Sequence, residues 1–254
     1  MKIAFFSDIH ANLPAMEAVL QDLEQKQPDM VYCLGDLVGY NVWANEVVEL
    51  IRKHRIPTIA GNYDEGVGLH SDDCGCAYKS EEDKSRGSQS IDYTNQIISP
   101  GNRKYLRELP RHLRVDFQTE EGEKLRILMV HGSPRKINEY LFEDRPENSL
   151  LRIMEDAGAD ILLFGHTHKP YHRQLESHGK YKHAINLGSV GKPKDGDPRA
   201  CYVLLELNEN SSAAVAESIN VTFVRVPYDV EQAARAVEES PLPNEFADML
   251  RNAY

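Results

Sequence analysis

The sequence predicts an α/β fold in which short buried strands alternate with helices. Two observations indicate this class. Apolar runs of four to six residues, mostly rich in β-branched or aromatic side chains, are typical of strands buried on both faces. Segments between these runs repeat apolar residues at helical spacing. The predicted strands are Lys2 to Phe6, Met30 to Leu34, Pro57 to Ala60, Leu125 to Val130 and Ile161 to Phe164.

The other elements follow from the same periodicities. Apolar residues at helical spacing predict a first helix from the cap Asn12 to about Gln25. Further helices are predicted at about 44–54, 147–157, 231–239 and 244–251, and strands at 171–175, 181–187, 201–207 and 213–225. A chain of 254 residues is expected to form one domain, 1–254.

The stretch from Glu65 to Arg111 interrupts the strand rhythm. It is polar and contains glycine at first, and then predicts helices at about 80–98 and from Pro100 to about Leu109. Two interpretations remain open. The stretch is either a helical insertion that roofs one side of a functional site, or a solvated excursion on the surface.

Metal-binding residue types follow each of the five apolar runs. They form the islands Asp8-Ile9-His10, Gly35-Asp36, Gly61-Asn62, His131-Gly132 and Gly165-His166-Thr167-His168. Ligands on open α/β sheets gather at the carboxyl ends of strands, where all five islands fall. Because a chain just past a strand is still extended, residues i and i+2 are expected to point the same way. Asp8 and His10 would then share one ion, and His166 and His168 would approach one site.

The donor set predicts two transition-metal ions. Imidazole and carboxylate with one amide suit Mn, Fe, Co, Ni or Zn better than Ca or Mg. Two such ions roughly 3.5–4 Å apart can clamp a phosphoryl group and hold a bridging hydroxide that acts as nucleophile. Any one island alone could be an ordinary turn residue or a satisfied polar group, but five islands after five runs favour a metal centre.

The order of these motifs resembles the calcineurin-like metallophosphoesterases over Met1 to about Val190, and in particular their small bacterial and archaeal phosphodiesterase branch. The resemblance implies a four-layer αββα sandwich of two mixed sheets. It also implies a set of roles, as follows. The first ion would be held by Asp8, His10, Asp36 and His168, and the second by Asp36, Asn62, His131 and His166. The catalytic residues would be Asn62, Tyr63 and His131. The substrate contacts would be Asn12, Tyr40 and Ser133.

Two positions depart from the family pattern. Tyr63 stands where the family usually has a histidine that protonates the leaving group, and Gly39 stands where the phosphatases have an aspartate that orients that histidine. The expected function is a phosphodiesterase acting on a small phosphate ester. A protein-interaction scaffold with the same fold and a weak or inactive metal centre is the main alternative, and a phosphomonoesterase is a lesser one.

Composition narrows the function classes. A formal net charge of -11 disfavours a broad surface for long nucleic acid. No apolar run approaches the length of a membrane span, and the run before Asp8 is too short for a signal peptide. We expect a reduced, cytoplasmic protein, with homo-oligomers compatible with the sequence. The pair Cys74 and Cys76 is interpreted as a plain loop rather than a metal or redox pair. The histidines outside the islands are expected to be solvated: His54, His70, His112, His172, His178 and His183.

Overall fold

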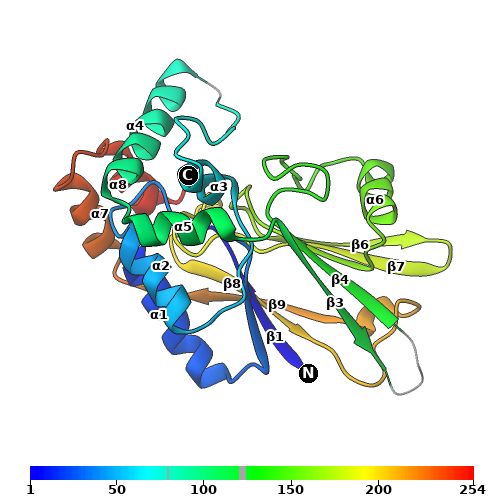
Figure 1. Ribbon diagram of the computed structural model, residues 1–254. Helices are drawn as coiled ribbons and strands as arrows, with labels where there is room; N and C mark the ends of the chain where they lie inside the picture. Colours follow the sequence, from blue (N-terminus) through cyan, green and yellow to red (C-terminus); the bar gives the residue numbers. More distant parts are fainter. Residues whose placement is uncertain (79, 120–123) are drawn as a thin grey trace.

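The computed structural model describes residues 1–78, 80–119 and 124–254. Two mixed β-sheets pack against each other, with helices on their outer faces (Figure 1). This arrangement confirms the predicted α/β class and the four-layer sandwich. The structure describes α1 (Leu13–Lys26), α2 (Ala44–Lys53), α3 (Asn62–Gly68), α4 (Glu81–Ile97), α5 (Pro100–Glu108), α6 (Glu147–Asp156), α7 (Val230–Glu238), α8 (Glu245–Asn252) and the 3-10 turn η1 (Ala216–Ser218).

The first sheet has the order β2-β1-β8-β9. Its strands are β1 (Lys2–Phe6), β2 (Met30–Cys33), β8 (Ala200–Glu206) and β9 (Asn220–Val226). β1 runs parallel to β2 and antiparallel to β8, which in turn pairs antiparallel with β9. The carboxyl ends of β1 and β2 therefore lie at the same edge of this sheet.

The second sheet has the order β3-β4-β5-β7-β6. Its strands are β3 (His112–Gln118), β4 (Lys124–Val130), β5 (Ile161–Phe164), β6 (Tyr171–Ser177) and β7 (Lys180–Asn186). The three central strands are parallel, and β3 and β6 pair antiparallel at the two edges. Loops that leave β4 and β5 thus emerge beside each other.

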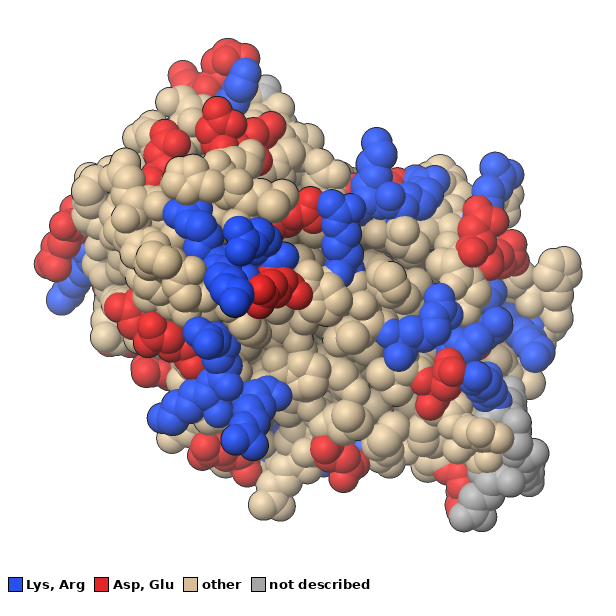
Figure 2. All heavy atoms as spheres, in the orientation of Figure 1, with Lys and Arg blue, Asp and Glu red and all other residues tan. Residues whose placement is uncertain are grey.

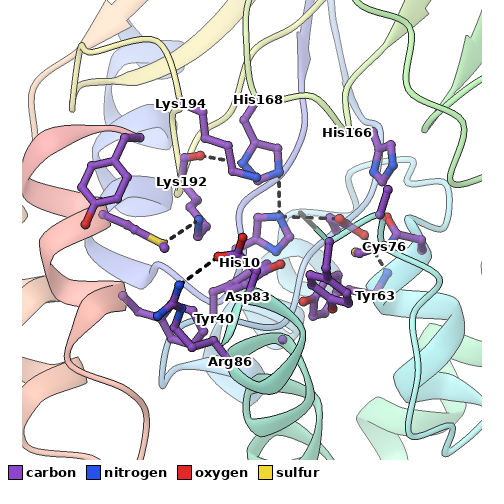
Figure 3. A pocket seen from close by; sticks show the side chains of 18 of the residues that line it. His10, Tyr40, Tyr63, Cys76, Asp83, Arg86, His166, His168, Lys192 and Lys194 are labelled. Carbon is purple, nitrogen blue, oxygen red and sulfur yellow. Dashed lines mark hydrogen bonds and ion pairs between the residues drawn. The ribbon is translucent and has the colours of Figure 1, made fainter. Parts of the chain in front are cut away.

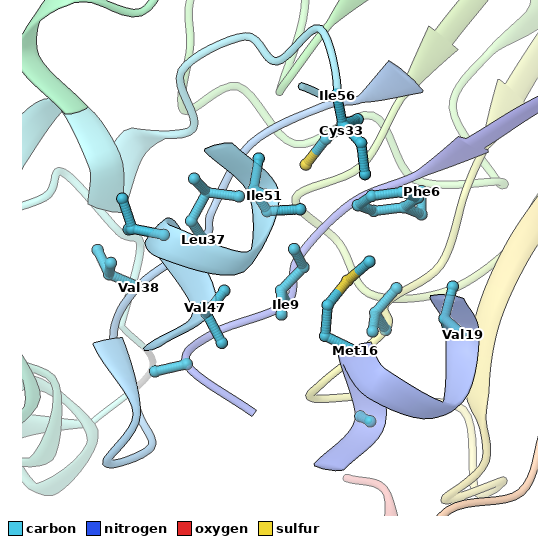
Figure 4. Packing of buried hydrophobic residues seen from close by; sticks show 14 of the residues in the cluster. Phe6, Ile9, Met16, Val19, Cys33, Leu37, Val38, Val47, Ile51 and Ile56 are labelled. Atoms are coloured by element: carbon cyan, nitrogen blue, oxygen red, sulfur yellow. The ribbon is translucent and has the colours of Figure 1, made fainter. Parts of the chain in front are cut away.

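Strand β1 shows why the apolar runs are continuous rather than alternating. Ile3 and Phe5 point into the core between the two sheets, whereas Ala4 and Phe6 point into the core beneath α1 and α2. All four side chains are almost fully buried. Figure 4 shows the second of these cores, where Phe6 lies with Met16 of α1 and residues of α2. Because both faces of the strand are covered, every position favours an apolar residue.

Several predicted elements differ from the observed ones. Pro57 to Ala60 is not a strand, because only one isolated bridge joins Thr58 to Cys33. Helix α3 begins at Asn62 itself, and β3 was not predicted. Of the predicted strand at 213–225, only the part from Asn220 onward is a strand, in β9.

The face shown in Figure 2 carries small groups of basic and acidic side chains that are interspersed. No helix within the described residues is long and apolar enough to cross a membrane.

Candidate metal centre

Backbone hydrogen bonds join the loops that leave the strand ends into one unit. Asp8 N donates to Gly35 O and His10 N donates to Asp36 O, each at 2.9 Å. In the other sheet, Gly165 N donates to His131 O at 2.9 Å. The two sheets are joined in turn because His166 N donates to Asp8 Oδ2 at 3.1 Å. The polar islands therefore meet at one place between the sheets.

The backbone of these loops is not extended, which corrects the reasoning from residues i and i+2. Five ligand candidates have left-handed backbone angles, with φ of 56° at Asp8, 47° at His10, 53° at Asp36, 66° at His166 and 60° at His168. Such angles are uncommon for residues with a side chain and cluster at functional sites. The chain turns sharply at each of these five residues, and this turn sets the direction of the side chain.

The side chains form two buried triads. One contains Asp8, His10 and His168, and the other contains Asp36, His131 and His166, with the ligand atoms of each triad within 4.8 Å of one another. His166 and His168 thus fall in different triads, and the expectation that they approach one site is wrong. The division agrees with the one that the family resemblance implied.

Asp36 of the second triad also faces the first. Its Oδ2 is 3.5 Å from His10 Nε2 in the first triad and 3.3 Å from His131 Nε2 in the second. Two glycines make room for the carboxylates, since a Cβ on Gly61 would overlap Asp36 Oδ1 and one on Gly165 would overlap Asp8 Oδ2. The tight packing fixes Asp36 where both triads can reach it.

Hydrogen bonds to backbone carbonyls orient three imidazoles. Nδ1–H of His10 donates to Val38 O at 3.0 Å, that of His131 to Leu34 O at 2.9 Å, and that of His168 to Lys192 O at 2.6 Å. Because a carbonyl can only accept, each Nδ1 carries a proton, so that in the neutral form of each ring the Nε2 lone pair faces the centre. Metal-binding histidines are oriented in this way.

These lone pairs meet other acceptors at short range. His10 Nε2 is 3.1 Å from His168 Nε2, and His131 Nε2 is 3.1 Å from Asn62 Oδ1. Asp8 Oδ1 and His166 Nε2 are buried without a hydrogen-bond partner in the described part of the chain. Converging acceptors repel one another unless a cation lies among them, and buried polar atoms almost always have a partner. The donor set therefore fits divalent metal ions.

The charge states of the free side chains agree with this. Burial lowers the pKa of His10 to about 3 and that of His166 to about 4, so both rings are neutral and able to bind metal at neutral pH. Burial and the neighbouring Asp36 raise the pKa of Asp8. At His131 burial opposes the charged form, but the carboxylates of Asp36 and Asp8 outweigh it and raise the pKa to about 10. A cation is thus favoured beside the two carboxylates.

Asn62 and Tyr63 occupy the first turn of α3. The Asn62 amide Nδ2 donates to Cys74 O at 2.9 Å, which leaves its Oδ1 facing His131. Tyr63 is 1% exposed, and its ring packs edge-on against His10 with centroids 5.4 Å apart. A Cβ on Gly39 would overlap the Tyr63 ring. The two departures from the family pattern are therefore in contact, with an aromatic ring where the histidine and its aspartate partner would meet.

Asp64 was missed by the sequence analysis. It is fully buried, Oδ1 accepts from Leu37 N at 2.9 Å, and Oδ2 accepts from Gly61 N at 3.0 Å. Burial and the nearby Asp36 raise its pKa to about 7. Its carboxylate ties the loop that carries Asp36 to the loop that carries Asn62. The available signal was its place in the first turn of a helix, where acceptors for free N–H groups are common.

A cavity of 380 Å³ opens above both triads (Figure 3). His10, Asp36, Asn62, His166 and His168 form its base. Residues from the 65–111 stretch form part of its wall: Cys76, Ala77, Tyr78, Asp83, Arg86 and Gly87. Part of this stretch therefore borders the site rather than standing off in solvent. Cys76 also accepts from Asn62 Nδ2 at 3.3 Å, so its loop is a wall of the site.

The three predicted substrate contacts have different surroundings. Tyr40 lines the cavity. Asn12 is fully buried and caps α1, with Oδ1 accepting from Ala15 N and Nδ2 donating to Gly191 O. Ser133 is buried, and its hydroxyl donates to Glu139. The side chains of Asn12 and Ser133 thus have structural partners, and only Tyr40 is among the described residues that border this cavity.

Other expectations for histidine and cysteine are partly corrected. His183 is fully buried, and its Nδ1 lies 2.9 Å from His172 Nε2, so the solvated surface role expected for His183 is wrong. The sheet register explains this, since His183 pairs with Ile161 in the centre of the second sheet. Cys33 and Cys201 are buried in the strands that contain them.

Comparison with known proteins identifies the class. A profile described as "Calcineurin-like phosphoesterase superfamily domain" matches residues 1–210. The chain therefore belongs to the calcineurin-like phosphoesterase superfamily, as the motifs indicated.

Relatives and solved structures agree with this assignment. An uncharacterized protein of Methanocaldococcus jannaschii is 32% identical over 98% of this chain and 96% of its own length. Phosphodiesterase YfcE of Escherichia coli is 28% identical over 89% of this chain and 98% of its own length. The crystal structure of a metallophosphoesterase from Sphaerobacter thermophilus superposes with a TM-score of 0.74 and 27% identity, covering 100% of this chain and 99% of that one. A hypothetical protein of Pyrococcus horikoshii, at 24% identity and a TM-score of 0.80 over 100% of this chain and 98% of its own, shares the fold.

Proposed function

We propose that this protein is a metal-dependent phosphodiesterase whose centre holds two divalent transition-metal ions. The observation that carries the proposal is the pair of buried triads at the base of an open cavity, with Asp36 of the second triad also 3.5 Å from His10 of the first. Membership of the phosphoesterase superfamily supplies the reaction class.

The ligand assignment follows the two triads. Asp8, His10 and His168 would hold one ion, His131, His166 and Asn62 the other, and Asp36 both. Two ions held there would polarise a phosphoryl group and supply hydroxide at neutral pH. Mn, Fe, Co, Ni and Zn all suit this mixed donor set.

The chain's own groups orient the substrate. His131 and the Asn62 amide would act through the second ion, because His131 Nδ1 is bonded to Leu34 O and Asn62 Nδ2 to Cys74 O, so both side chains fix the place where that ion would meet the phosphoryl oxygens. Burial raises the pKa of Tyr63 well above 10, so Oη keeps its proton and can donate a hydrogen bond toward the leaving oxygen.

The shape of the cavity favours a diester over a monoester. A diester carries a second organic group that must be accommodated beyond the phosphorus. The wall above the triads provides room for it, with aromatic faces from Tyr40, Tyr78 and Phe246. The phosphodiesterase name of the Escherichia coli relative points the same way.

The test is a substrate panel with metal removal and return. Chelator-treated protein is reloaded with each of the five metals and assayed against matched mono- and diesters of p-nitrophenol. We expect no turnover without metal, about two ions per chain by elemental analysis, and higher kcat/KM on diesters. Asp116→Asn removes an exposed carboxylate on β3. It is the matched control for Asp36→Asn, because each variant loses one negative charge.

Contrary results discriminate between the alternatives. Two bound ions with no hydrolysis of any ester would favour the scaffold. Faster turnover of monoesters would favour a phosphomonoesterase. Protein that binds no metal on titration would refute the proposed centre.

A further inference from the structure

Two lysines line the cavity above the metal-binding side chains. Lys192 and Lys194 lie on the loop between β7 and β8, and Figure 3 shows both beside His168. Lys192 is only 3% exposed. Its Nζ lies 4.7 Å from the centroid of the Tyr40 ring and 3.4 Å from Met249 Sδ. A lysine amine buried in aromatic and thioether surroundings is unusual, because burying its charge without a counter-charge is costly. Burial, and then the neighbouring Lys194, lower the pKa of Lys192, and burial also lowers that of Lys194, so a bound anion would favour the protonated form of both.

Neither ammonium has an ion pair within the part of the chain that the structure describes, although the cavity holds other charges. Arg86, on the same wall, is compensated by Asp83 at 2.9 Å and Glu245 at 3.7 Å. The recorded contacts of Lys192 Nζ are the uncharged Tyr40 ring and Met249. Among the described residues that line this cavity, the two lysines are therefore the basic side chains without an anionic partner.

The backbone of the lysine loop is attached directly to the centre. Lys192 O accepts from His168 Nδ1 at 2.6 Å, and Lys194 N donates to His168 O at 3.2 Å. Lys192 N also donates to Ser189 Oγ, whose hydroxyl donates to Asp8 O. These bonds attach the loop that carries both lysines to two of the proposed metal-binding residues. The distance between the lysines and the metal centre is therefore fixed for any molecule that contacts both.

We propose that Lys192 and Lys194 form a second anion site, which binds a phosphate group of the substrate other than the phosphoryl group that is cleaved. This inference rests on the proposed function and narrows its substrate class to phosphodiesters that carry a further phosphate. Ammonium groups are strong phosphate binders, and a desolvated cation–phosphate contact is worth more than an exposed one.

Charge balance supports this substrate class. Two divalent ions would bring about four positive charges against the two carboxylates of Asp8 and Asp36 and one hydroxide, which leaves about one, and the two lysines would add up to two more when an anion keeps them protonated. A simple diester supplies a single negative charge. A terminal phosphate adds roughly 1.5 to 2 more at neutral pH, which brings the filled cavity much closer to neutrality.

The kinetic test uses two probes with the same leaving group, thymidine 5′-(p-nitrophenyl phosphate) with and without a 3′-phosphate. We expect the 3′-phosphate to raise kcat/KM of the metal-loaded protein roughly 10- to 100-fold, the range of one charge-assisted contact. Lys192→Met and Lys194→Met should each reduce that ratio. Lys169→Met, which removes an exposed lysine next to His168, is the matched control and should retain it.

A binding measurement separates the anion site from catalysis. Isothermal titration of metal-loaded protein compares thymidine 3′,5′-bisphosphate with thymidine 5′-phosphate. The bisphosphate should bind the wild type and Lys169→Met more tightly than thymidine 5′-phosphate does. This difference in affinity should disappear in the two cavity variants, Lys192→Met and Lys194→Met. If no ester is turned over but the advantage and its loss are observed, the anion site stands while the proposed hydrolysis fails. An equal affinity of the wild type for both nucleotides, or an advantage that the cavity variants keep, would overturn the anion site.

Discussion

The contact between Gly39 and Tyr63 predicts a measurable coupling. Gly39 has φ of 92°, and a Cβ there would lie 2.7 Å from Tyr63 Cε1 and closer still to Cδ1. The ring is 1% exposed and cannot move aside. The backbone angle alone should cost Gly39→Ala roughly 1–2 kcal/mol. Overpacking against the ring should add about 1–3 kcal/mol, for a total of about 2–5 kcal/mol.

Removing the Tyr63 ring separates the cost of the backbone angle from the cost of overpacking. In a Tyr63→Ala background, Gly39→Ala should cost only the backbone share, about 1–2 kcal/mol. Gly179→Ala is the matched control, because Gly179 has φ of 72° with no atom within 4 Å of its built Cβ. Its cost should be the same in both backgrounds.

Urea denaturation of chelator-treated protein measures all of these variants. The free energies of unfolding are compared at unchanged slope, so that each shift of the midpoint reports stability. If the costs of Gly39→Ala and Tyr63→Ala add to within about 0.5 kcal/mol, the two residues are uncoupled and the steric argument is refuted.

Three further predictions concern the centre and the second sheet. Asp36→Asn should lower metal content more than any other single ligand change, since Asp36 faces both triads; full occupancy by elemental analysis would show that it is not shared. Tyr63→His should narrow the ratio of aryl- to alkyl-diester rates, because an imidazolium is a better acid than a phenol and general acid catalysis is worth roughly 10²–10⁴-fold; an unchanged ratio with both metals bound would contradict this. Burial, with His172 beside it, lowers the pKa of His183 from 6.5 to about 4, so its neutral form contributes stability that is complete above pH 6.5 and is lost as the pH falls toward 4. His183→Gln should therefore lose less unfolding free energy than the wild type between these pH values, by up to about 3 kcal/mol, and identical pH profiles in urea denaturation would argue against it.

The strands that carry the centre could be predicted because burial on both faces marks them in the sequence. Leu162 and Phe164 of β5 point toward α6, and Ile161 and Leu163 point into the core between the sheets, so the whole segment is apolar. Edge strand β3 gives a weaker signal. Its outward positions are exposed and its inward positions are only half-buried. It also directly follows a helical stretch, so its alternating pattern was not recognised as a separate strand.

The ligand types could be predicted, but their geometry could not. Asp8 and His10 at a strand end are compatible with either extended or left-handed backbone, and the choice depends on bonds to Gly35 and Asp36 from another loop. Such tertiary bonds leave no periodic trace in the sequence. The same is true of Lys192, whose burial depends on Tyr40 and Met249, far away in the chain.

The left-handed angles at Asp8, His10, Asp36, His166 and His168 affect how mutagenesis of this centre can be interpreted. Aspartate, asparagine and histidine adopt this backbone region several-fold more readily than most other side chains, alanine included. An alanine scan would therefore remove a donor atom and also disturb the turn that aims the neighbouring ligands. Replacement by asparagine keeps the turn and changes the donor, and replacement by glycine keeps the turn and deletes the donor. A pair of such variants at each position would separate the effect of the donor atom on metal binding from the effect of the backbone turn on the neighbouring ligands.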